Sequence, residues 1–187
     1  MVNIINNPYL PAFELHTILH GEEKLHMIHK RLENGGTYRM ESELIDIIDK
    51  GNKKGAVLVD RVTGYLVNEK GEESKAYYID RSVFAKSLGG SGFKGTGKST
   101  NLPAPPKRNP DVVIKDKTFI NQALLYRLNG DPNPLHVDPN IAALARFERP
   151  IIHGTPPIHS GLATYGTVAR SIVQNLLGND AEKMQSI

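Results

Sequence analysis

The chain has 187 residues and no cysteine, and its formal net charge is +3 at pH 7. The length is sufficient to bury the core of one or two domains, and the absence of cysteine excludes disulfides, thiolate metal sites and a cysteine nucleophile. Lysines and acids are interspersed and only 6% of the residues are aromatic, so the pattern predicts a solvated surface rather than a nucleic-acid-binding face. No apolar run has the length of a transmembrane helix, and the first seven residues lack the basic and apolar regions of a secretory signal.

The first half of the chain predicts a short helix followed by an antiparallel meander. Apolar residues spaced for one helical face predict a helix from Gly21 to Leu32, which Gly35 and Gly36 would end. Three runs rich in β-branched and aromatic residues follow, separated by turns that contain glycine, asparagine and lysine. These runs predict strands over residues 38–49, 56–67 and 75–88.

The middle of the chain, Gly89 to Pro110, is dense in glycine and proline and predicts an exposed linker. Within it, Gly92 to Ser99 fits the pattern of a phosphate-binding P-loop. That mechanism requires a helix directly after the loop, with its N-terminus pointing at the phosphate. The segment Thr100 to Pro106 contains three prolines and cannot form a helix of useful length. Nucleotide binding is therefore the weakest of the functional alternatives.

The second half predicts helices. The first runs from Thr118 to Leu128 and ends at Asn129 and Gly130. A second opens with Asp138 as its N-cap and Pro139 as its first helical residue, and continues to Ala145. The longest, from Gly161 to Leu177, has an apolar stripe and places Gly178 at the position where a helix commonly ends.

A short polar segment between these helices carries the strongest chemical signal. Asp131, Asn133 and His136 are separated by Pro132 and Pro134, which fix their own φ angles and bias the residues before them towards extended conformations. A carboxylate, an amide and an imidazole can thereby converge on one small volume, as an acid–base reaction with water requires. The simpler alternative is that the first two residues form turns and the histidine lies on the surface.

The segment from Asp131 to Pro139 resembles the signature of the type-2, R-specific enoyl-CoA hydratases, also called MaoC-like dehydratases. The resemblance continues through Asn140 to Ala145 and through Phe147 to Gly154. The first half resembles the leading unit of the two-hotdog form of this family, the hydratase part of the peroxisomal multifunctional β-oxidation enzyme. Leu19 to Glu23 and Ile48 to Gly51 stand there at the expected places. The resemblance covers nearly the whole chain and implies an α+β protein with the hotdog fold.

The same resemblance implies a double-hotdog arrangement whose second unit is incomplete. We expect residues 1–88 to form the leading, acyl-binding unit, residues 89–115 a linker and residues 116–187 the catalytic MaoC-like unit, truncated at its C-terminus. The sequence stops where the family continues into further strands, so the helix of residues 161–177 would lose most of its covering sheet. Such a chain would be marginally stable, aggregated or dependent on a partner.

The reaction implied by the resemblance is the reversible hydration of a trans-2-enoyl-CoA to a (3R)-3-hydroxyacyl-CoA in fatty acid β-oxidation. Asp131 and His136 would form the acid–base pair that holds the water, and Asn133 would orient His136 or the substrate. The amide of Gly154 would donate to the developing enolate oxygen. Further substrate contacts would come from His20, Gly21, Lys50, Pro132, Pro134 and Leu135.

The resemblance implies no metal and no cofactor, with coenzyme A present only as part of the substrate. It also implies a homodimer and a peroxisomal location, although no targeting signal is visible in the sequence.

One departure from the family pattern lies beside the proposed oxyanion donor. Residues 155–161 separate Gly154 from the long helix, whereas in the family this glycine runs directly into the helix. Either Gly154 or Gly161 could open the helix. A hotdog protein that binds acyl-CoA or a partner without catalysis is therefore the main alternative to an enzyme.

Overall fold

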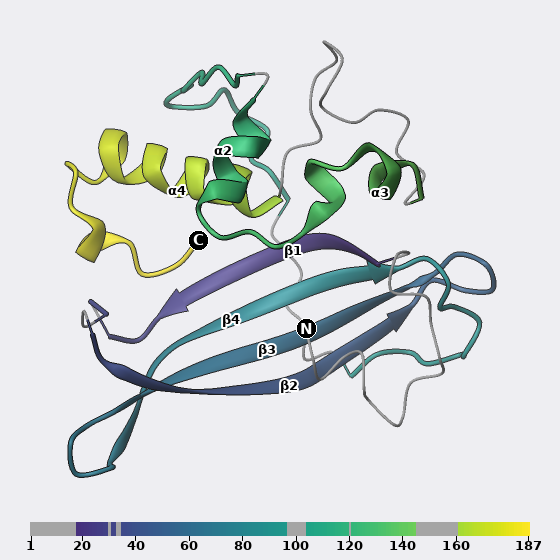
Figure 1. Ribbon diagram of the computed structural model, residues 1–187, viewed down its shortest axis with the longest axis horizontal. Helices are drawn as coiled ribbons and strands as arrows, with labels where there is room; N and C mark the ends of the chain where they lie inside the picture. The colour runs from purple at the N-terminus through teal and green to yellow at the C-terminus, as the bar shows by residue number, and fades with distance from the viewer. Residues whose placement is uncertain (1–17, 30, 33–34, 97–103, 120, 145–160) are drawn as a thin grey trace. The chain divides into compact units, whose positions relative to one another are not determined.

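A four-stranded antiparallel sheet occupies the first half of the chain (Figure 1). The computed structural model describes residues 18–187 apart from 30, 33–34, 97–103, 120 and 145–160. The strands lie in the order β1-β4-β3-β2, so β1 and β2 are the two edges. They are β1 (Ile18–Met27), β2 (Thr37–Asp49), β3 (Ala56–Val67) and β4 (Glu73–Ala85).

The three strands predicted from β-branched and aromatic content are confirmed, within three residues at each end, as β2, β3 and β4. The helix predicted from Gly21 to Leu32 is wrong, because Ile18–Met27 is strand β1, paired along its length with β4. Backbone hydrogen bonds to β4, together with bonds from Leu25 and Met27 to the C-terminal residues on the other side, outweigh the helical spacing of the apolar residues.

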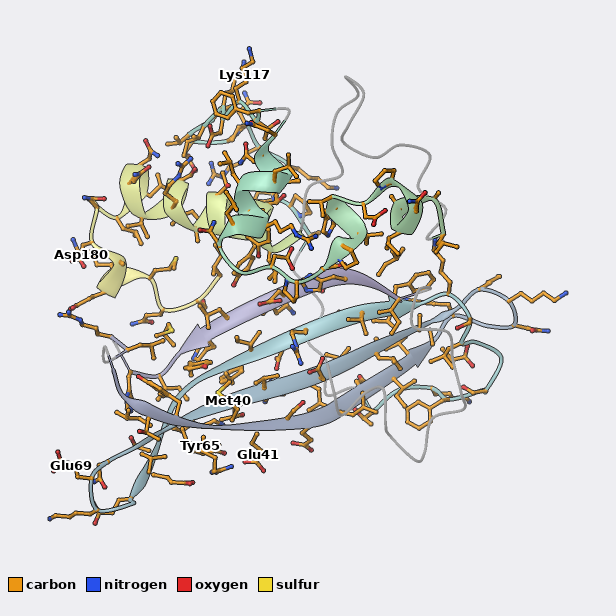
Figure 2. All side chains as sticks on the ribbon, in the orientation of Figure 1. Met40, Glu41, Tyr65, Glu69, Lys117 and Asp180 are labelled. Carbon is orange, nitrogen blue, oxygen red and sulfur yellow. The ribbon has the colours of Figure 1, made fainter. Side chains whose placement is uncertain are left out.

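The apolar core of this unit lies on one face of the sheet. Residues directly opposite each other on neighbouring strands have side chains on the same face. Leu58 of β3 stands opposite Val83 of β4 and Ile47 of β2, and the three pack together. Leu58 is fully buried, which contributes about 1.5–3 kcal/mol of transfer free energy. The same cluster includes Ala56, Ala85, Leu88, Ile18 and Leu44. Successive residues of a strand point to opposite faces, as Figure 2 shows for Met40 and Glu41 of β2.

A row of alternating charge crosses this core face. Arg81 of β4 lies opposite Asp60 of β3 on one side and opposite Glu23 of β1 on the other. The Nε and Nη2 atoms of Arg81 both donate to Oδ2 of Asp60, and the Nε bond measures 3.2 Å. Asp60 is only 1% exposed, so its charge depends on this guanidinium for compensation.

Residues 103–176 form a second compact unit, whereas residues 177–187 belong with the first. The second unit contains α2 (Gln122–Leu128), the 3₁₀-helix η2 (Pro134–His136), α3 (Pro139–Leu144) and α4 (Gly161–Leu176). These elements confirm the three predicted helices, although α2 begins four residues later than predicted. In the portions that the structure describes, no helix is long and apolar enough to cross a membrane.

Two of the predicted helix boundaries, the start of α3 and the end of α4, have the capping features that the sequence predicted. Oδ1 of Asp138 accepts hydrogen bonds from the amides of Asn140 and Ile141 and so caps α3. Gly178, two residues after the end of α4, has a φ of +64°, the left-handed conformation that commonly ends a helix. No residue of α4 is buried, and Leu162, Val168 and Leu176 on this helix are exposed.

The C-terminal residues pair with the edge strand β1. The amides of Leu25 and Met27 donate to the carbonyls of Ile187 and Gln185, each at 2.8 Å, and the Ile187 amide donates back to Leu25. A 3₁₀-helix, η4 (Ala181–Lys183), precedes this contact. This pairing satisfies backbone groups that an edge strand would otherwise expose.

Candidate functional site

The segment with Asp131, Asn133 and His136 leaves the C-terminal end of α2. Helix α2 ends at Leu128, and the Gly130 amide donates to the carbonyl of Arg127 at 3.0 Å. Gly130 has a φ of +98°, a conformation that favours glycine. This glycine turns the chain sharply out of the helix immediately before Asp131.

Successive side chains then hold the backbone of this segment. Oδ1 of Asp131 accepts the amide of Asn133 at 3.0 Å, and Oδ1 of Asn133 accepts the amide of Leu135 at the same distance. Each bond closes a turn in which a side chain replaces a backbone acceptor. Asn133 thereby caps η2, whose first residue is Pro134 and whose last is His136.

The extended conformation predicted for Asn133 is confirmed by its φ of −70° and ψ of 115°. Asp131 and His136 are partly buried, whereas Asn133 and the two neighbouring prolines are exposed. Asp131 and Asn133 therefore form turns, as the simpler alternative predicted, and their hydrogen bonds fix the segment that carries His136. The structure places the three polar residues on one short stretch whose backbone is held by its own side chains.

His20 and Gly21, predicted to contact the substrate, lie in the first compact unit at an irregularity in β1. The pairing with β4 shifts by one residue between His20 and Glu22, which makes Gly21 a β-bulge. A Cβ atom on Gly21 would lie 3.3 Å from the carbonyl oxygen of Ser82, so a side chain there would be tight. Beyond the bulge, Nε2 of His20 lies 3.1 Å from Oε2 of Glu23. This hydrogen bond, opposed in part by burial, raises the pKa of His20 above its usual value.

Lys50, the third predicted substrate contact in this unit, follows the last residue of β2 and has an exposed side chain. Its amide donates to the carbonyl of Gly55 at 3.1 Å, which closes the β2–β3 turn. Asp49, the residue before it, accepts the amide of Gly51 through Oδ1 at 2.8 Å. The backbone on both sides of Lys50 is therefore held by hydrogen bonds.

The glycine-rich segment that fits the P-loop pattern has a different role in its described part. Its amides donate to carboxylates of the protein: Gly92 to Oδ2 of Asp49 at 2.7 Å, and Thr96 to Oδ1 of Asp46 at 2.6 Å. The hydroxyl of Thr96 donates to the carbonyl of Ile45 at 2.9 Å. Amides bonded in this way are not available to phosphate. The described part of the segment instead lies along the last residues of β2.

Some predicted site features fall outside the described residues. Gly154 and residues 155–160 of the insert are among them, and α4 begins at Gly161. Within the residues that are described, no group of three or more acidic or histidine side chains is arranged to hold a metal ion.

Two family profiles divide the chain between them. Residues 2–86 match the MFE-2 hydratase 2 N-terminal domain, and residues 101–187 match the MaoC-like domain. A solved MaoC-like dehydratase from Phytophthora capsici has a TM-score of 0.73 and 30% identity to this chain, covering 95% of this chain and 55% of that one. The α+β fold described above is thus the hotdog fold of MaoC-like proteins.

The chain thus carries an MFE-2 hydratase 2 N-terminal domain and a MaoC-like domain. Among curated relatives, it is 40% identical over 177 residues to the peroxisomal multifunctional enzyme type 2 of Mus musculus, spanning 94% of this chain and 22% of that protein. It is 32% identical over 176 residues to the probable enoyl-CoA hydratase 2 of Dictyostelium discoideum, spanning 94% of this chain and 55% of the relative. The chain thus spans about half the length of these relatives, or less.

Two residues beside the predicted substrate contacts of the first unit were not identified from the sequence. Glu23 and Asp49 were each noted only within a stretch that carries the family resemblance, and neither was given a role. A sequence pattern could have identified each residue. Glu23 follows His20 by three residues, with a glycine between them. Asp49 and Gly51 form the Asp-x-Gly pattern of a turn closed by a side chain.

Proposed function

We propose that this chain carries the hydratase activity of its family, the reversible addition of water to a trans-2-enoyl-CoA to give a (3R)-3-hydroxyacyl-CoA. The named relatives and both matching domains support hydration of enoyl thioesters in β-oxidation. The direction, the stereochemistry and the residues that act are our inference. The observation that carries the proposal is the internally bonded segment from Asp131 to His136.

In the proposed reaction, Asp131 and His136 hold one water molecule. One of the two residues accepts a proton from the water while the water oxygen bonds to C3 of the enoyl group. The other residue gives a proton to C2. The π electrons of the C2–C3 double bond move towards the thioester, so negative charge develops on its oxygen. A backbone amide at that oxygen, assigned to Gly154, would stabilise this charge.

Asn133 has a supporting part in this proposal. Its side-chain oxygen accepts the Leu135 amide and fixes the start of η2, so Asn133 orients His136 through the backbone. The apolar and proline residues of the same segment, Pro132, Pro134 and Leu135, would line the acyl group.

For coenzyme A we propose contacts with His20, Gly21 and Lys50. The exposed lysine offers a positive charge to a phosphate group, and Gly21, at the bulge, is also exposed. We propose no metal and no cofactor, a homodimer, and a peroxisomal location in keeping with the peroxisomal relatives.

The test is to incubate the chain with trans-2-hexenoyl-CoA and follow the loss of absorbance from its conjugated thioester. Chiral analysis of the product should give the R isomer alone. An S or racemic product would contradict the assigned family chemistry, and no loss of absorbance would contradict the activity.

The non-catalytic alternative is favoured by one observation, the absence of buried side chains on α4. Binding of hexanoyl-CoA in a calorimeter, without turnover of the unsaturated analogue, would support that alternative.

A further inference from the structure

The Asp49 carboxylate accepts four hydrogen bonds at the end of the sheet where Lys50 lies. Its Oδ1 accepts the amides of Gly51 at 2.8 Å and Gly90 at 3.0 Å. Its Oδ2 accepts the hydroxyl of Ser91 at 2.9 Å and the amide of Gly92 at 2.7 Å. Four donors from two separate chain segments therefore converge on one side chain.

These two segments approach too closely for side chains to separate them. A Cβ atom on Gly89 would lie 2.7 Å from the carbonyl oxygen of Gly51 and 2.9 Å from the amide nitrogen of Gly55. A Cβ atom on Gly90 would lie 3.2 Å from Cα of Asn52. The segment after β4 thus lies directly on the turn that follows Lys50, and the Asp49 carboxylate joins the two.

The bonds strongly favour the ionised form of Asp49. The amide of Gly51 is the largest of the causes that hold the pKa of this carboxyl far below its usual range, followed by the amide of Gly90. A carboxylate saturated by donors in this way acts as a fixed acceptor and not as an acid or base.

We propose that Asp49 is a positioning residue for coenzyme A binding: its carboxylate clamps the Gly89–Gly92 segment onto the β2–β3 turn and so fixes the backbone from which Lys50 reaches a phosphate. The proposal rests on the proposed function, because it takes the contact between Lys50 and coenzyme A from it. The glycine-rich segment then serves binding by packing, not by cradling phosphate with its own amides.

Two physical effects of Asp49→Asn have opposite signs, which makes the substitution informative. Removing a negative charge beside Lys50 would, by electrostatics alone, strengthen binding of an anionic ligand. Replacing one carboxylate oxygen by an NH₂ group would place this donor against the N–H or O–H groups that the oxygen accepts. The turn would be released and binding would weaken. The clamp proposal predicts the second result.

The experiment measures binding of hexanoyl-CoA by calorimetry and turnover of trans-2-hexenoyl-CoA for the wild-type chain and four variants. For Asp49→Asn we expect Kd and KM to rise about tenfold, the loss of one hydrogen bond to a charged group, with kcat unchanged. Lys50→Ala should give a similar rise. The double variant should be no worse than Lys50→Ala, because Asp49 acts only through Lys50.

Asp46→Asn is the matched control. The substitution removes the same charge. Asp46 bonds Thr96, which lies beyond the Gly89–Gly92 segment, so the Lys50 turn stays in place and Kd should keep the wild-type value. If Asp49→Asn does not fold, as judged by circular dichroism, Ser91→Ala removes a single donor from the clamp. It should raise Kd about twofold.

Each result has one meaning. Unchanged or tighter binding by Asp49→Asn, or by Ser91→Ala in its place, overturns the clamp while leaving hydratase activity standing. Additive losses in the double variant also overturn it, because Asp49 would then act elsewhere. A wild-type chain that binds hexanoyl-CoA but does not hydrate overturns the proposed function, and the same binding cycle still decides the clamp. A wild-type chain that binds no hexanoyl-CoA overturns both.

Discussion

His20 and Glu23 are three residues apart in a β-strand, yet their side chains meet on the same face, with Nε2 and Oε2 3.1 Å apart. In a regular strand, residues three apart point to opposite faces. The bulge at Gly21 inserts one extra residue, so His20 stands opposite Val83 and Glu23 opposite Arg81 on the core side. The glycine therefore brings an imidazole and a carboxylate together at the predicted ligand contact.

Replacing Glu23 by glutamine should lower the pKa of His20, because the hydrogen bond that the His20 ring donates to the Glu23 carboxylate is the largest cause that raises it. A raised histidine pKa contributes stability that is fully present below the unfolded value of 6.5 and is lost as pH rises through the folded value. The free energy of unfolding of the wild-type chain should therefore exceed that of Glu23→Gln by the largest amount at about pH 5–6. This difference should become smaller at higher pH. NMR titration of the His20 ring and urea unfolding across this range measure both effects. The control Glu22→Gln should leave the pKa of His20 unchanged. If Glu23→Gln also left it unchanged, Glu23 would not be the cause of the raised pKa.

Arg81→Met should destabilise the chain by about 3 kcal/mol, because Asp60 would remain buried without its cation. The value lies at the lower end for buried pairs, since the Arg81 side chain keeps 26% of its surface exposed. Denaturant unfolding measures the loss. Adding Asp60→Leu to Arg81→Met should recover most of the stability, and no recovery would mean that packing rather than charge accounts for the effect.

Asp138→Ala should destabilise the second unit by about 1 kcal/mol, the usual cost of losing an N-cap. The carboxylate accepts two amides at the start of α3, and alanine accepts neither. Thermal unfolding measures the shift, with Asp111→Ala as an exposed carboxylate in the same unit for comparison. Equal shifts in the two variants would show that the cap contributes nothing specific.

Lys98→Ala should change neither stability nor any response to ATP. In the described part of the glycine-rich segment, the amides of Gly92 and Thr96 already donate to protein carboxylates, so no phosphate cradle is present there. Calorimetry with ATP and magnesium should show no binding to the wild-type chain. Binding that disappears on this substitution would restore the P-loop interpretation.

Most of the sheet could be predicted from the sequence, because the runs that form β2, β3 and β4 are rich in β-branched and aromatic residues and bounded by turn residues. The strand β1 could not. The helical spacing came from Leu25, Ile28 and Leu32, of which only Leu25 lies in the strand. The pairing with β4 depends on residues some sixty positions away.

The loop of the candidate site was predicted more fully than its surroundings. Proline at 134 predicted the extended Asn133, and Asp138 predicted the cap of α3. The clamp at Asp49 joins residues about forty positions apart, and no local pattern encodes which glycine amides meet which carboxylate. The roles of Asp131, His136 and Gly154 remain predictions, because hydrogen bonds within a loop do not identify the reacting groups.

The central claim, that Asp131 and His136 act together on one water, is tested most directly by the kcat for trans-2-hexenoyl-CoA in Asp131→Asn, His136→Gln and the double variant. Both substitutions keep the side chains nearly isosteric, and the side-chain oxygen that Asp131→Asn retains would still accept the Asn133 amide. We predict that each single variant loses about 10²–10⁴ in kcat while hexanoyl-CoA binding and unfolding stay close to wild type. The double variant should be scarcely slower than either single one, since the two groups act as a unit. Near-wild-type turnover in either single variant would contradict the claim.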